Sequence, residues 1–166
     1  MNRTCFLISL LVTTLTAKAQ VEVTWGPELK YSNNTYHAKV IGSDDSLLYV
    51  LGVKDKTFGQ PEHYLQRFSI ETLDMKDALL LEIPSVFGNN PVLENALLFN
   101  GEILLFASEL DLVGKTTNAF CYKVKADGTI NAASIKLGSA AYTSKKDPGQ
   151  YRFQLTADSS RILVHF

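Results

Sequence analysis

Residues 92–110 read VLENALLFNGEILLFASEL. Two mostly apolar runs meet at Asn100-Gly101 in this stretch. Asn-Gly between apolar runs is the strongest short-range signal for a β-hairpin, because a type I′ turn needs positive φ at both central residues. The stretch therefore predicts two antiparallel strands, at 92–99 and 102–110, joined by a tight turn.

The same pattern of short apolar runs and turn residues fills the rest of the chain after the N-terminal segment. No window there keeps a helical apolar period for three turns, so we expect an all-β protein. The runs form two complete rounds of four strands and an incomplete third. The expected strands are 35–41, 46–53, 64–70 and 78–83, then 92–99, 102–110, 119–125 and 130–137, and finally 151–156 and 161–166.

The two complete rounds repeat with a nearly constant spacing. Leu48-Tyr49-Val50 falls on Leu104-Leu105-Phe106 at an offset of 56, and Tyr64 falls on Ala119 at an offset of 55. A repeat of about fifty residues with four strands is typical of β-propeller blades, whose strands are covered on both faces and read as continuous apolar runs. We expect four-stranded antiparallel blades of a β-propeller, two complete and a third begun, at about 35–83, 92–138 and a truncated 151–166.

One segment of the third round carries a family resemblance. Phe153-x-Leu155-Thr156-x-Asp158-x-x-Arg161-Ile162-Leu163-Val164 resembles the opening of WD40-like propeller repeats, which read F-x-S-P-D-G-x-x-I-x-F. Ala157 and Ser159 stand where that pattern has proline and glycine. The resemblance implies the N-terminal part of a secreted bacterial propeller protein, with binding and scaffolding roles, and it carries over no catalytic residue.

The N-terminal segment reads as a secretory signal peptide. Arg3 precedes an apolar run at 5–15, and Ala17-Lys18-Ala19 is a small-x-small cleavage pattern before Gln20. The apolar run is shorter than the roughly 20 residues that span a bilayer. A core strand of a cytoplasmic protein is the alternative interpretation. We predict a signal peptide at 1–19, cleavage between Ala19 and Gln20, a secreted or periplasmic location, and a partial propeller domain at 20–166.

The end of the sequence suggests that more chain follows. The last expected strand is apolar up to Phe166, and such an unpaired edge invites aggregation. A closed propeller also needs at least four blades. We therefore expect the N-terminal fragment of a longer protein, whose missing remainder is one possible partner of this segment.

The charge balance argues against a nucleic-acid partner. Removal of 1–19 takes away Arg3 and Lys18, which leaves 14 basic and 17 acidic residues and a net charge of −3. A nucleic-acid-binding protein carries a basic surface instead. One cysteine, Cys121, remains in the mature chain, so we expect a buried, unreactive thiol and no internal disulfide.

Motifs for metal, cofactor or catalytic chemistry are weak. The three histidines, His37, His63 and His165, lie in different segments, so we expect no metal site. Gly114-Lys115-Thr116-Thr117 resembles the end of a phosphate-binding loop, but Glu109 stands where that motif needs a glycine. We assign the run to a strand connection and expect no cofactor and no catalytic residue.

The lengths of the connections indicate where a ligand binds. Short turns alternate with long connections at 54–63, 84–91, 111–118 and 138–150, and successive turns of an antiparallel meander lie at opposite ends. The long connections therefore share one end, here called the long-loop end, and rigid scaffolds carry function on such loops. The candidate ligand-binding residues are Phe58, Gln60, His63, Asn89, Asn90, Lys115, Tyr142 and Lys145.

Two functions remain open at this point. The first is an exported, non-catalytic binding or scaffold module that holds a protein or carbohydrate ligand at the long-loop end. The alternative is the propeller portion of a secreted hydrolase for polysaccharides or peptides, with its catalytic residues outside this chain. Neither function involves nucleic acid or a membrane span.

Overall fold

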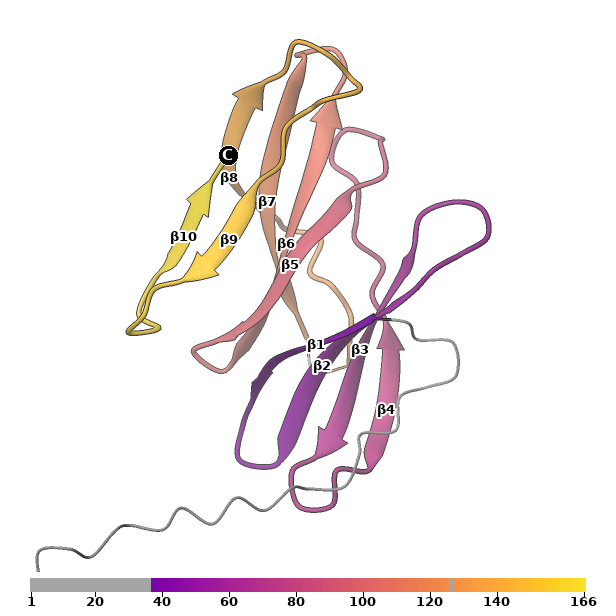
Figure 1. The fold of residues 1–166 in the computed structure, drawn as a ribbon, viewed down its shortest axis with the longest axis vertical. Coiled ribbons are helices and arrows are strands. Elements are labelled where there is room, and N and C mark those ends of the chain that lie inside the picture. Colours follow the sequence, from indigo (N-terminus) through magenta and orange to yellow (C-terminus); the bar gives the residue numbers. More distant parts are fainter. Residues whose placement is uncertain (1–36, 126) are drawn as a thin grey trace, which may run out of the picture.

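A computed structural model describes residues 37–125 and 127–166. The described part of the chain is built from ten β-strands and connecting segments, which confirms the all-β prediction (Figure 1). The predicted signal peptide and its cleavage site lie outside the described residues. The strands are β1 (His37–Ser43), β2 (Leu47–Lys54), β3 (Glu62–Ser69), β4 (Met75–Leu80), β5 (Val92–Phe99), β6 (Glu102–Asp111), β7 (Thr116–Val124), β8 (Ile135–Ala141), β9 (Arg152–Leu155) and β10 (Ile162–His165).

The strands form two four-stranded antiparallel sheets and one hairpin. The sheets have the orders β1-β2-β3-β4 and β5-β6-β7-β8, and β9 pairs with β10. Strands therefore follow one another in space as they do in sequence, as expected for a repeated meander. Asn100 and Gly101 have φ of 50° and 76°, which confirms the predicted type I′ geometry between β5 and β6.

A first core lies between the two four-stranded sheets. The sheet β1–β4 contributes Leu51 and Leu65, and the facing side of β5–β8 contributes Leu105, Phe120 and Tyr122. All five side chains are buried. Each large apolar side chain removed from water in this way stabilises the fold by roughly 1.5–3 kcal/mol.

A second core lies on the opposite side of the sheet β5–β8, against the β9–β10 hairpin. Phe106 and Cys121 face Tyr151 and Phe153 there, and the rings of Phe106 and Phe153 stack with their centroids 4.7 Å apart. Successive residues of β6 thus point into different cores, with Leu105 in the first and Phe106 in the second. This two-sided burial explains why β6 reads as a continuous apolar run.

The first strands of the three units approach one another closely. β1 packs beside β5, and β5 beside β9 (Figure 1). Gly42 fits against Leu98, because a Cβ atom on residue 42 would overlap that side chain. Asn95 connects all three units, since it accepts a 2.6 Å hydrogen bond from Lys39 Nζ and donates a 2.8 Å bond to the Phe153 carbonyl oxygen.

One connection and one strand differ from the sequence prediction. The predicted long connection at 111–118 is wrong: β6 and β7 meet in a tight turn in which Asp111 Oδ1 accepts hydrogen bonds from the backbone N–H groups of Val113 and Gly114. The predicted strand at 130–137 is interrupted, because Ile130 bridges to Val124 but continuous pairing of β8 begins only at Ile135. Asn131–Ser134 separate these two paired stretches.

Successive connections alternate between the two ends of the sheets as predicted, but their lengths do not divide as predicted. The connections after β2, β4, β6 and β8 lie at one end, and those after β1, β3, β5, β7 and β9 at the other. The turn at 125–129 is tight, with hydrogen bonds from Lys125 N to Thr129 O and from Gly128 N to Lys125 O. The whole β7–β8 connection nevertheless covers 125–134, which is longer than the β2–β3 loop, and it lies at the opposite end. The prediction that all long connections share one end is therefore wrong, although three of the four connections at the long-loop end are long. None of the residues that the structure describes belongs to a helix long and apolar enough to cross a membrane.

Candidate functional site

Three of the candidate residues converge on one pocket at the long-loop end. This pocket, here called the inter-unit pocket, has a volume of about 370 Å³. Gln60 comes from the β2–β3 loop and Asn89 and Asn90 from the β4–β5 connection, so the lining joins segments that are distant in sequence. The other polar residues used below that line it are Glu94, Ser108, Glu109, Thr117 and Gln150.

The β4–β5 connection is held in place by a buried glutamate, Glu109. Its side chain is 2% exposed and lies in β6. Glu109 Oε1 accepts hydrogen bonds from Ser85 Oγ at 2.6 Å, Phe87 N at 2.8 Å and Asn89 N at 3.0 Å. Glu109 Oε2 accepts a fourth, from Val86 N at 2.7 Å. A carboxylate that organises three backbone N–H groups fixes the loop conformation and the position of its asparagines.

A second network joins β5, β6 and the β8–β9 connection. Glu94 Oε1 accepts a 2.6 Å hydrogen bond from Ser108 Oγ, and Glu94 Oε2 accepts a 3.1 Å bond from Gln150 Nε2. Thr117 Oγ1 donates a 2.6 Å bond to the Pro148 carbonyl oxygen. These contacts hold the 148–150 segment in the lining of the pocket.

His63 lines a neighbouring pocket of about 230 Å³ together with Gln60 and Asn90. The imidazole is half-buried, and this burial lowers the pKa of His63 because it disfavours the charged form. Burial therefore favours the neutral form of the His63 imidazole. The two pockets share Gln60 and Asn90, so four of the eight candidate residues belong to one continuous region.

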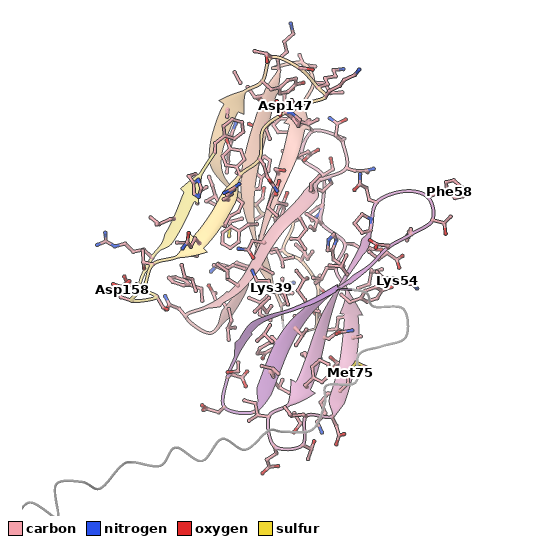
Figure 2. The ribbon with its side chains drawn as sticks, viewed as in Figure 1. Lys39, Lys54, Phe58, Met75, Asp147 and Asp158 are labelled. Carbon is pink, nitrogen blue, oxygen red and sulfur yellow. The ribbon has the colours of Figure 1, made fainter. Side chains whose placement is uncertain are left out.

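The other four candidates lie outside this region. Phe58 is 88% exposed, and Figure 2 shows it at the outer tip of the β2–β3 loop, pointing away from the sheets. Lys115 lies in the tight β6–β7 turn with φ of 50°. Tyr142 lines a separate pocket of about 220 Å³ beside Pro148 and Phe166, and Lys145 is exposed on the same connection. These four residues lie at the predicted end of the sheets, but the structure does not bring them together in one site.

Sequence reasoning missed Glu94, Ser108, Glu109 and Gln150 as site residues. Glu109 carried a usable signal, since a glutamate inside the apolar run of β6 requires hydrogen-bond partners when buried. Glu94, Ser108 and Gln150 carried none. Glu94 and Ser108 meet across the paired strands β5 and β6, and Gln150 reaches Glu94 only through the connection that returns from β8.

Chemistry based on metals or phosphates finds little support in the geometry. The part of the chain that the structure describes holds no group of three or more His, Cys, Asp or Glu side chains placed to bind a metal ion. Gly114 and Lys115 form the β6–β7 turn and Thr116 begins β7, so the phosphate-loop-like run is a strand connection, as predicted.

No family matches. No family model fits the chain, and neither a curated protein nor a solved structure is similar enough to count as a match. The inter-unit pocket is therefore interpreted from its own geometry.

Proposed function

We propose that this protein is an exported, non-catalytic binding module that holds its ligand at the long-loop end. The observation that carries the proposal is the convergence of Gln60, Asn89 and Asn90 on the inter-unit pocket of about 370 Å³. That volume is within the range of ligand sites, about 300–1,000 Å³, and such sites combine apolar walls with a few fixed polar groups. The scaffold is preorganised, since Glu109 fixes the loop that carries both asparagines.

The scaffold is proposed to be of β-propeller type. Two features support this interpretation. The sheets stack face to face, and the closest approach between units is through their first strands β1, β5 and β9. Propeller blades are four-stranded sheets arranged around a central axis, which brings the first strands of neighbouring blades together.

Export is the second part of the proposal. It rests on the order of Arg3, the apolar run at 5–15 and Ala17-Lys18-Ala19. Expression with the native N-terminus in a secreting host tests it, because N-terminal sequencing of the exported product should begin at Gln20. Recovery of cell-associated protein that retains Met1 would remove export from the proposal.

Binding is tested by screening the purified protein against glycan and peptide arrays. A double variant, Gln60→Ala with Asn90→Ala, should lose the ligand found, since both side chains are exposed and line the inter-unit pocket. A matched variant at the opposite end, Glu71→Ala with Lys76→Ala, should keep it. Loss through the second variant alone would place the site at the other end. Turnover of an array ligand would contradict a non-catalytic role.

A further inference from the structure

We infer that the inter-unit pocket accepts a lysine-type side chain, an aliphatic stem that ends in an ammonium group. This inference rests on the proposed function and names the ligand class for the same site. It depends on three features of the pocket: uncompensated negative charge, free acceptor capacity at Glu94, and walls without aromatic rings.

Two glutamates give the pocket its negative charge. Glu94 and Glu109 both line it, and every hydrogen bond recorded to either one comes from a neutral donor. In the described chain the ion pairs join other acids: Glu62 with Lys56, Asp77 with Arg67, and Glu102 with Lys123. Among the residues that the structure describes, neither glutamate of the pocket therefore has a cation within ion-pair distance, and the pocket lining contains no Lys or Arg.

The two glutamates differ in what they offer a ligand. Glu109 accepts four hydrogen bonds and is 2% exposed, so it contributes charge but makes no direct contact. Glu94 is half-buried and accepts only two, one at each oxygen. A carboxylate has about four acceptor positions, which leaves Glu94 capacity for the donors of an ammonium group. Partial burial strengthens this attraction relative to open water.

The remaining walls suit a hydrocarbon stem. Val92, Leu110 and Pro148 line the pocket and present apolar surface. Lysine stems bury their methylene groups against such surface while the charged end stays with polar partners. No aromatic side chain is among the pocket-lining residues, so the stacking platform on which sugar rings commonly rest is missing there. The lining thus favours a peptide ligand over a carbohydrate.

The test uses three small probes and the 166-residue chain. N-acetyl-lysine N-methylamide carries the ammonium, its norleucine counterpart has a similar stem without charge, and the Nε-acetylated form has a neutral polar end. Binding is followed by NMR, through chemical-shift changes of the backbone and side-chain amides of Gln60, Asn90 and Gln150. We expect saturable shifts with the lysine probe and affinity at least about tenfold lower for both neutral probes, as the loss of one charge-assisted hydrogen bond implies.

The variant Glu94→Gln removes the charge at nearly constant side-chain size. It should lower the affinity for the lysine probe by about tenfold or more. Glu102→Gln is the matched control, because Glu102 is in the same sheet but pairs with Lys123 outside the pocket. The affinity of the Glu102→Gln variant for the lysine probe should equal that of the wild type.

Equal binding of the norleucine and lysine probes to the wild type would overturn the inference even if Glu94→Gln failed to fold. Absence of saturable shifts in the pocket, or unchanged affinity in a folded Glu94→Gln protein, would overturn it as well. Each of these results leaves the proposed function standing if an array ligand still depends on Gln60 and Asn90. Loss of that dependence would instead remove the proposed function.

Discussion

Asn95 in β5 donates a 2.8 Å hydrogen bond from its side-chain amide to the carbonyl oxygen of Phe153 in β9. The bond joins β5 to the β9–β10 hairpin, which is a separate sheet with no strand pairing to β5. The same asparagine accepts hydrogen bonds from Lys39 Nζ and from the backbone N–H of Ala96. One polar side chain therefore links all three units, in addition to apolar packing and to other bonds between units such as that from Tyr151 Oη to the Thr117 carbonyl oxygen.

Asn95→Ala should destabilise the protein by about 1–3 kcal/mol, because it leaves the Phe153 carbonyl without this partner. Urea denaturation followed by circular dichroism measures the change. Asn131→Ala is the control: its side chain accepts a hydrogen bond from Ala133 N in an exposed turn, and its loss should change stability by less than about 0.5 kcal/mol. Equal effects of the two substitutions would show that Asn95 does not couple the units.

Glu109→Gln should destabilise the protein by about 3 kcal/mol and release the β4–β5 connection, because an amide can accept at only one of its two positions. Hydrogen exchange of the Val86, Phe87 and Asn89 amides should accelerate relative to the wild type. Glu102→Gln, which removes an exposed ion pair with Lys123, should cost no more than about 1 kcal/mol. Unchanged exchange at 86–89 in the Glu109 variant would contradict the anchoring role.

Cys121 should resist thiol reagents in the folded protein. Its side chain is 7% exposed in the second core, and burial raises the pKa of the thiol, so the reactive thiolate is disfavoured. Alkylation at pH 8 followed by peptide mass mapping should leave Cys121 unmodified without denaturant and fully modified in urea. Rapid labelling of the native protein would mean that the β9–β10 hairpin opens readily from the sheet.

Asp158 should make the β9–β10 turn sensitive to acid. Hydrogen bonds from the hydroxyls of Thr156 and Ser160, and from Ser160 N, lower the pKa of Asp158 to about 2. A carboxyl whose pKa is depressed on folding adds stability above its unfolded pKa, about 3.9, and loses that contribution as pH falls towards 2. The difference in Tm between the wild type and Asp158→Asn should therefore be present at pH 6 and shrink between pH 4 and pH 2. A constant difference over that range would be inconsistent with this assignment.

Much of the fold follows from local signals in the sequence. Asn100-Gly101 specifies its turn through backbone geometry alone, and the apolar runs locate the strands to within a few residues at most ends. Local signals failed where a side chain changed the path of the backbone. Asp111 closes the β6–β7 turn by accepting hydrogen bonds from two backbone N–H groups. The connection is therefore shorter than the polar residues at 111–118 had suggested.

The site was predictable only in part, for a related reason. Antiparallel alternation places a loop at one end of a sheet, and that was enough to select Gln60, Asn89 and Asn90. It does not determine the direction in which a loop leans, so Phe58 was expected in the site but points into solvent. Glu94 and Gln150 are 56 residues apart and meet only after β8 has returned the chain, a contact that no short-range pattern encodes.

The position of the sheet β5–β8 between two cores has a consequence for how this sequence can diverge over time. A substitution at Leu105 must remain compatible with the side chains of the sheet β1–β4, and one at Phe106 with those of the β9–β10 hairpin. Neighbouring positions of β6 are therefore constrained by different units. If the two complete units arose by duplication, the second has been constrained on both faces. Compensating changes in β6 would then have to arise in pairs with changes in β2 or β3 on one side and β9 on the other. Distant relatives of this chain should therefore be recognised by residues that covary between units. Sequence identity within a single unit should be a weaker signal.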